Sequence, residues 1–171
     1  MRRRTLLRVG IASTVLLAAA GVGISLMPAT WQAPRLSPEG RAIFDAVAHA
    51  VLEGALPQQQ AARADALQAH LGRVEETING FPKPVQDELT LLLGLLASGP
   101  GRLGLAGLAS PWQQASTADV RAMLQKLRLS SMDLRQQTYQ ALRDITYAAY
   151  FADRSTWATL GYAGPVELQP R

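Results

Sequence analysis

Hydrophobic side chains recur every three to four residues along most of the chain after residue 37, as in amphipathic helices. Ser37 is a suitable N-cap and Pro38 a suitable first helical residue. The apolar stripe that follows predicts a helix that Pro57 ends; it comprises Ile43, Phe44, Val47, Val51 and Leu52. A second stripe predicts a helix over about residues 59–78, with Asn79-Gly80 as its stop.

The next segment begins at Pro84 and is rich in leucine. It predicts a third helix, apolar nearly all round, which we expect to be buried at the centre of the fold or shared with a partner. Residues 98–111 are rich in glycine and proline and predict a loop, pinned on the core by Leu103, Leu105 and Leu108.

Two more helices follow. Ser116 and Asp119 have the spacing of a capping box, and a long helix extends to about Tyr150. No alternating run of β-branched residues occurs, so we expect no sheet. The sequence predicts an all-α domain over residues 38–166, a small bundle of five or six helices, with a tail over residues 167–171.

The N-terminal segment has a different composition. The first eight residues carry four arginines and no acid, and no charge occurs from Val9 to Pro34. A basic segment before an apolar one is typical of an export signal. The order of Arg3, Arg4, Leu6 and Leu7 resembles the twin-arginine (Tat) pattern, whose route carries folded proteins. We predict a Tat signal or signal-anchor helix over residues 1–28 and a linker over residues 29–37.

Whether the signal is cleaved stays open. Met27-Pro28-Ala29 is a poor cleavage site, while Val9 to Met27 is 19 residues long, near the lower limit for crossing a bilayer core. Arginines remain on the cytoplasmic side, so both outcomes place the domain in the periplasm, either soluble or anchored to the inner membrane.

The charge balance excludes one class of partner. The chain has 17 Lys+Arg and 13 Asp+Glu, and four of the basic residues lie in the leader. The remaining 13 basic residues are matched by 13 acidic ones and form no basic stripe in the sequence. We therefore expect no binding to nucleic acid.

Residues for catalysis or metal binding are scarce. The chain has no cysteine, and His49 and His70, 21 residues apart, are expected as surface or helix-flank histidines rather than metal ligands. The acidic pairs Glu75-Glu76 and Asp87-Glu88 are expected on solvated helix faces. A hydrolase that uses Ser130 or Ser131 with a histidine has no support in the spacing. We expect no catalytic, cofactor-binding or metal-binding residue, and hence no enzyme.

The C-terminal segment has the most specific pattern. Ser155 is expected to cap a short helix that contains Trp157 and Leu160. Amphipathic aromatic residues are frequent at interface hot spots, so this segment is expected to fasten the tail to the bundle, to bind a partner, or both. The candidate partner-binding residues are Trp157, Gly161, Tyr162, Gly164 and Pro165.

Several features together resemble the gluconate 2-dehydrogenase subunit 3 family. They are a helix that ends in Leu56-Pro57, a leucine-rich middle helix, Arg128-Leu129-Ser130 before the long helix, and the ending Trp157…Gly161-Tyr162-Ala163-Gly164-Pro165. The resemblance covers most of residues 40–166.

The resemblance implies a function. Members of that family are small, non-catalytic subunits that escort a leaderless flavoprotein dehydrogenase of the glucose-methanol-choline type through the Tat translocase and remain bound to it. It implies no cofactor in this chain, FAD in the large partner subunit, and a cytochrome c subunit as the usual electron acceptor. The alternative interpretation is a free-standing, membrane-anchored envelope protein with a structural or binding role.

Overall fold

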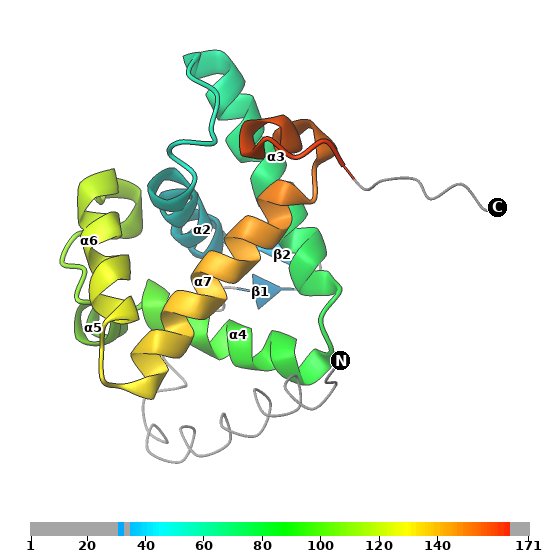
Figure 1. Ribbon diagram of the computed structural model, residues 1–171. Coiled ribbons are helices and arrows are strands. Elements are labelled where there is room, and N and C mark those ends of the chain that lie inside the picture. Colours follow the sequence, from blue (N-terminus) through cyan, green and yellow to red (C-terminus); the bar gives the residue numbers. More distant parts are fainter. Residues whose placement is uncertain (1–30, 33–34, 165–171) are drawn as a thin grey trace.

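The computed structural model describes residues 31–32 and 35–164 (Figure 1). The predicted signal over residues 1–28, with Arg3, Arg4, Leu6 and Leu7, lies outside the described residues, as do Pro165 and the tail. Within them the chain is all-α, as the sequence predicts. Its long helices are α2 (Pro38–Val51), α3 (Gln60–Asn79), α4 (Lys83–Ala97), α6 (Thr117–Arg128) and α7 (Asp133–Phe151).

Two helices begin where the sequence predicts. The Ser37 hydroxyl oxygen accepts a hydrogen bond from the Gly40 amide (3.2 Å) at the start of α2. The Ser116 hydroxyl oxygen accepts one from the Asp119 amide (3.1 Å) at the start of α6. Each bond satisfies an amide that has no partner within its own helix.

Helix α2 ends earlier than predicted, at Val51 rather than at Pro57. Leu52 and Leu56 leave the helical path and bury their side chains in a small cluster with Tyr150 of α7. The Tyr150 hydroxyl donates to the Ala55 carbonyl oxygen (2.8 Å) within this turn. Tertiary packing therefore ends the helix before proline does.

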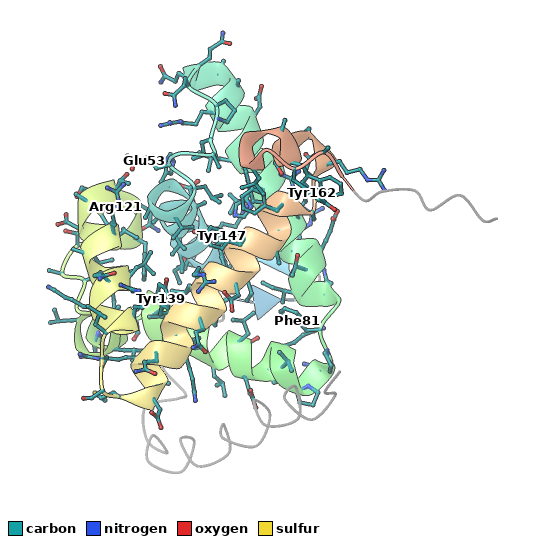
Figure 2. The ribbon with its side chains drawn as sticks, viewed as in Figure 1. Glu53, Phe81, Arg121, Tyr139, Tyr147 and Tyr162 are labelled. Atoms are coloured by element: carbon teal, nitrogen blue, oxygen red, sulfur yellow. The ribbon has the colours of Figure 1, made fainter. Side chains whose placement is uncertain are left out.

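The core lies around α2, which packs against α3, α4, α6 and α7. Figure 1 shows α7 crossing the molecule, and it contacts α3 and α6 as well as α2. The fully buried side chains of this core include Ile43, Phe44, Val47, Val74, Ile78, Leu93, Leu96, Val120 and Leu142. An ion pair between Glu53 and Arg121 joins the turn after α2 to α6 at the surface (Figure 2).

The leucine-rich helix α4 is not the central element. It buries Leu89, Leu93 and Leu96 on one face. Leu91, Leu92 and Leu95 are only half-buried, and Val85 is exposed. The prediction of a central buried helix is wrong because the leucine pattern does not show which face receives a neighbour, and α2 occupies the centre.

Residues 99–106 of the predicted loop are helical, whereas residues 107–111 have no regular secondary structure, so the prediction is wrong only for the first part. The helical part forms a short turn, α5 (Gly99–Gly101), and one turn of π-helix, η3 (Arg102–Ala106), before the 3-10 turn η4 (Trp112–Gln114). Leu105 and Leu108 are buried as predicted, whereas Leu103 is 60% exposed. The Trp112 indole N–H donates to the Leu96 carbonyl oxygen (2.8 Å), which fastens this segment to the end of α4.

The predicted linker over residues 29–37 contributes to the fold at its described end. Strands β1 (Trp31–Gln32) and β2 (Arg35–Leu36) pair antiparallel, the one departure from the expectation of no sheet. Leu36 is buried, and its amide donates to the Glu75 carboxylate (3.2 Å), which also pairs with Arg41 (2.5 Å). Glu75 therefore links α3 to β2 and to α2, and the prediction that it lies on a solvated helix face is wrong.

Gly101 and Gly104 offer a matched pair of substitutions. A Cβ on Gly101 would collide with the Leu95 carbonyl oxygen, whereas one on Gly104 would meet nothing within 4 Å. We expect Gly101→Ala to lower the free energy of unfolding by about 1–3 kcal/mol, as overpacking does. Gly104→Ala should leave it unchanged or raise it by about 0.5–1 kcal/mol. Urea unfolding measures both, and equal values for the two variants would contradict the close approach.

Candidate functional site

The C-terminal segment after α7 contains the residues that the sequence singles out. The 3-10 helix η5 (Arg154–Leu160) follows α7 after a sharp turn and packs back on it. Its N-cap is Asp153, whose carboxylate oxygen accepts from both the amide (2.9 Å) and the hydroxyl (2.7 Å) of Ser155. The prediction that Ser155 is the cap is therefore wrong by two residues.

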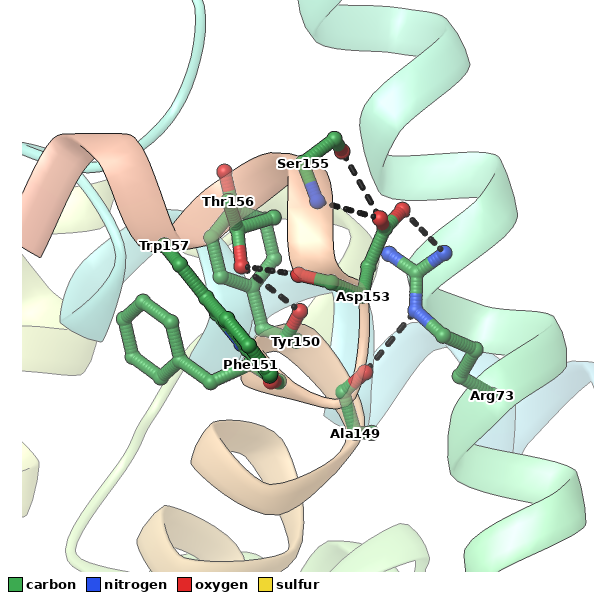
Figure 3. A network of polar contacts seen from close by, with 8 residues as sticks. All are labelled: Arg73, Ala149, Tyr150, Phe151, Asp153, Ser155, Thr156 and Trp157. Atoms are coloured by element: carbon green, nitrogen blue, oxygen red, sulfur yellow. Dashed lines mark hydrogen bonds and ion pairs between the residues drawn. The ribbon is translucent and has the colours of Figure 1, made fainter. Parts of the chain in front are cut away.

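Asp153 also contacts Arg73 of α3 (Figure 3). The Arg73 Nε donates to the Ala149 carbonyl oxygen (2.8 Å), and its Nη1 pairs with the second oxygen of Asp153 (3.3 Å). A carboxylate at position 153 can pair with this cation and cap η5 at once. The hydrogen bonds from Ser155, with a smaller contribution from Arg73, hold the pKa of Asp153 below its usual range.

Trp157 fastens η5 to the end of α7. Its indole N–H donates to the Phe151 carbonyl oxygen (2.8 Å), and its ring centroid lies 5.3 Å from that of Tyr162. The Arg154 guanidinium lies 5.7 Å from the Trp157 ring centroid, at cation–π distance. This half-buried indole is the anchor of the segment.

Two glycines reverse the chain around this anchor. Gly161 (φ 67°) and Gly164 (φ 102°) have left-handed backbone conformations that other residues rarely adopt. Gly161 ends η5, and a Cβ built on Gly164 would lie 3.6 Å from the Trp157 ring. The structure thus brings together Trp157, Gly161, Tyr162 and Gly164, while Pro165 lies outside the described residues.

The outer side of this segment is apolar. Leu160 is 57% exposed and Tyr162 is 50% exposed. Figure 2 shows Tyr162 beyond the C-terminal end of α7, whereas Tyr139 and Tyr147 lie along that helix. We call the surface of Trp157, Leu160 and Tyr162 the C-terminal face. It combines exposed apolar area with a backbone held by hydrogen bonds, which keeps the entropic cost of binding low.

His70 is the site residue that sequence reasoning missed. It was expected on a surface or helix flank, but its side chain is fully buried between α3 and α7, with its ring 6.1 Å from that of Tyr150. Neither ring nitrogen has a hydrogen-bond partner among the described residues, and the same holds for the Thr146 hydroxyl. Burial, and then the charge of Arg73, lowers the pKa of His70 to about 4. The signal was its position, three residues after Leu67 and four before Val74 on the apolar stripe.

His49 lies elsewhere, beside a shallow surface pocket of about 440 Å³ between α2 and the start of α6. Its Nε2 is 4.0 Å from the Asp45 carboxylate one turn earlier, and both side chains reach solvent. The Ser116 hydroxyl at the rim donates to Asp119 (2.7 Å), and neither Ser130 nor Ser131 lines the pocket. The arrangement does not assemble a nucleophile, base and orienting acid.

Residues 31–32 and 35–164 contain no group of three or more His, Cys, Asp or Glu side chains placed to hold a metal ion. Over the same residues no single helix has the length and apolarity to cross a bilayer, although α4 taken with Gly99–Ala106 meets those criteria as a pair bent by 88°.

Burial of His70 predicts a dependence of stability on pH. The folded protein disfavours the protonated imidazole, so stability is complete above pH 6.5 and falls as the pH decreases toward 4. We expect a loss of about 3 kcal/mol at most over that range, measured by urea unfolding at a series of pH values. His70→Leu should flatten the profile, while His49→Gln, at the surface, should not. An unchanged slope in His70→Leu would contradict the assignment.

The Asp153 cap predicts the local stability of η5. Asp153→Asn retains an acceptor for Ser155 but loses the charge that faces Arg73, whereas Asp153→Ala loses both. We expect Asp153→Ala to raise the hydrogen-exchange rate of the Ser155 amide roughly fivefold, since a lost cap costs about 1 kcal/mol. Asp153→Asn should have a smaller effect because partly exposed ion pairs contribute little. An exchange rate in Asp153→Ala equal to that of the unsubstituted protein would show that the carboxylate does not act as a cap.

Comparisons with family models, with curated proteins and with solved structures gave no match for this chain.

Proposed function

We propose that this chain is the non-catalytic small subunit of a flavoprotein dehydrogenase of the glucose-methanol-choline type. It escorts the leaderless large subunit through the Tat pathway and stays bound to it in the periplasm. The sequence of Arg3, Arg4, Leu6 and Leu7 supports the route, because the Tat translocase transports proteins that are already folded. A leader helix precedes the bundle in this proposal, cleaved or retained as a membrane anchor.

The C-terminal face is the observation that carries the proposal. It contains Trp157 and Tyr162, two of the residues in the ending that resembles the family, and it exposes Leu160 and Tyr162 beside the half-buried Trp157. Large apolar and aromatic side chains on a pre-organised backbone are typical of interface hot spots. The face is therefore assigned to the dehydrogenase subunit, which would supply FAD and pass electrons to a cytochrome c subunit.

Export of the partner tests the escort role. In a cell that produces both proteins, substitution of Arg3 and Arg4 by lysine should leave the dehydrogenase in the cytoplasm, because the large subunit has no leader of its own. Fractionation followed by flavin absorbance and dehydrogenase activity in each fraction measures this. Normal export of the dehydrogenase, with only this chain mislocalised, would instead support the free-standing envelope protein.

Truncation of the C-terminal face tests the binding surface. Tyr162→Ser should weaken the affinity for the dehydrogenase by tenfold or more, since truncation of a hot-spot residue costs about 2 kcal/mol. Leu129→Ser removes an apolar side chain that is 68% exposed at the far end of the molecule and serves as the control. Co-purification and surface plasmon resonance with the isolated large subunit measure both variants. Equal binding of the two variants would contradict the assignment.

A further inference from the structure

A second set of exposed apolar side chains lies at the other end of α7. Leu103 of η3 is 60% exposed, Leu129 after α6 is 68% exposed, and Met132 before α7 is 53% exposed. The structure brings their three segments together: η3 contacts α6, and the Arg135 guanidinium donates to the Gly104 carbonyl oxygen (2.8 Å). Figure 1 shows this end of the molecule opposite η5. We call the surface of Leu103, Leu129 and Met132 the basal surface.

Positive charge surrounds the basal surface. The segments that form it, residues 99–108 and 123–137, contain one acidic residue, Asp133, and four basic ones, Arg102, Lys126, Arg128 and Arg135. None of the four forms an ion pair with another described residue, which is also true of Arg35, Arg63 and Arg154. Lys126 and Arg128 are exposed, whereas the guanidinium groups of Arg102 and Arg135 donate to nearby backbone carbonyl oxygens. The chain outside the leader has balanced charge, so this excess of cations is local.

We propose that the basal surface docks on an anionic phospholipid bilayer. Exposed apolar side chains at the turns of the bundle can enter the boundary between headgroups and acyl chains, while flanking arginine and lysine side chains contact lipid phosphates. Lys126 and Arg128, both exposed, suit this role because the aliphatic stem of a long basic side chain can lie along apolar surface while the charged end reaches outward. Leu129 and Met132 flank Ser130 and Ser131 in the short connection between α6 and α7. This connection can insert into the bilayer surface without opening the bundle.

Docking leaves the C-terminal face free. The two surfaces lie at opposite ends of α7, whose 19 residues span roughly 28 Å. A bundle that rests on lipid through its basal surface therefore presents Leu160 and Tyr162 away from the bilayer. Docking through the basal surface requires neither the dehydrogenase partner nor retention of the leader.

A local probe tests this docking in the full chain. The leader can hold the chain on a vesicle by itself, so bulk binding would not report on the basal surface. The chain has no cysteine, and Leu129→Cys therefore gives a single site for an environment-sensitive fluorophore. Leu160→Cys, at the other end of the molecule, is the matched control. A thermal unfolding midpoint equal to that of the unlabelled protein shows that each labelled variant is folded, and Met132→Cys is the second basal site.

The expected result is a difference between the two ends. On vesicles of phosphatidylethanolamine and phosphatidylglycerol, the label at position 129 should shift to the blue and be quenched by nitroxide lipids, while the label at position 160 should not. Lys126→Gln with Arg128→Gln should weaken docking, each lost charge by roughly fivefold, and high salt should act in the same direction.

Two results would overturn the proposal. One is a label at position 129 that remains in an aqueous environment on anionic vesicles, or that responds no more than the label at position 160. The other is a response that appears only when the dehydrogenase subunit is added without lipid, which would assign the basal surface to a protein partner.

Discussion

Packing of α7 against α3 is the contact on which the rest of the structure depends. It buries His70 and Thr146 without hydrogen-bond partners in the described part of the chain, at a cost that the surrounding apolar contacts must offset. The same contact places Arg73 beside the last turn of α7, where it binds the Ala149 carbonyl oxygen and faces Asp153. Arg73 thereby links the start of η5 to α3, while the Trp157 indole links η5 to the end of α7.

Helix starts and the core positions of most helices could be predicted from the sequence because their causes are local. Ser37 and Ser116 cap amides only three residues away, and the apolar stripes on α2, α3 and α6 face the core as their spacing requires. Leu142, Ile145 and Ala149 of α7 are inward for the same reason. The sequence of a helix alone sets which of its faces is apolar, whatever element packs against it.

The incorrect predictions concern residues whose positions depend on contacts with parts of the chain that are distant in sequence. Asp153 caps η5 and also pairs with Arg73, 80 residues earlier, a contact that the sequence does not reveal. Glu75 is held by the Leu36 amide and by Arg41, which the sequence places far away. His70 is buried because it lies on the apolar stripe of α3, although its side chain is polar. Leu103 lies in the π-helical turn η3, and its side chain is exposed to solvent. Trp157, Gly161, Tyr162 and Gly164 lie together in the structure, and their role in binding a partner stays a prediction.

Helix α7 runs without interruption from Asp133 to Phe151, and this continuity has a mechanical meaning. A regular helix turns by about 100° and advances about 1.5 Å with each residue. The side chains at its two ends are therefore fixed in their direction around the helix axis as well as in their separation along it. One inserted residue would rotate everything beyond it by more than a quarter of a turn, so the number of residues in α7 sets the direction in which η5 points.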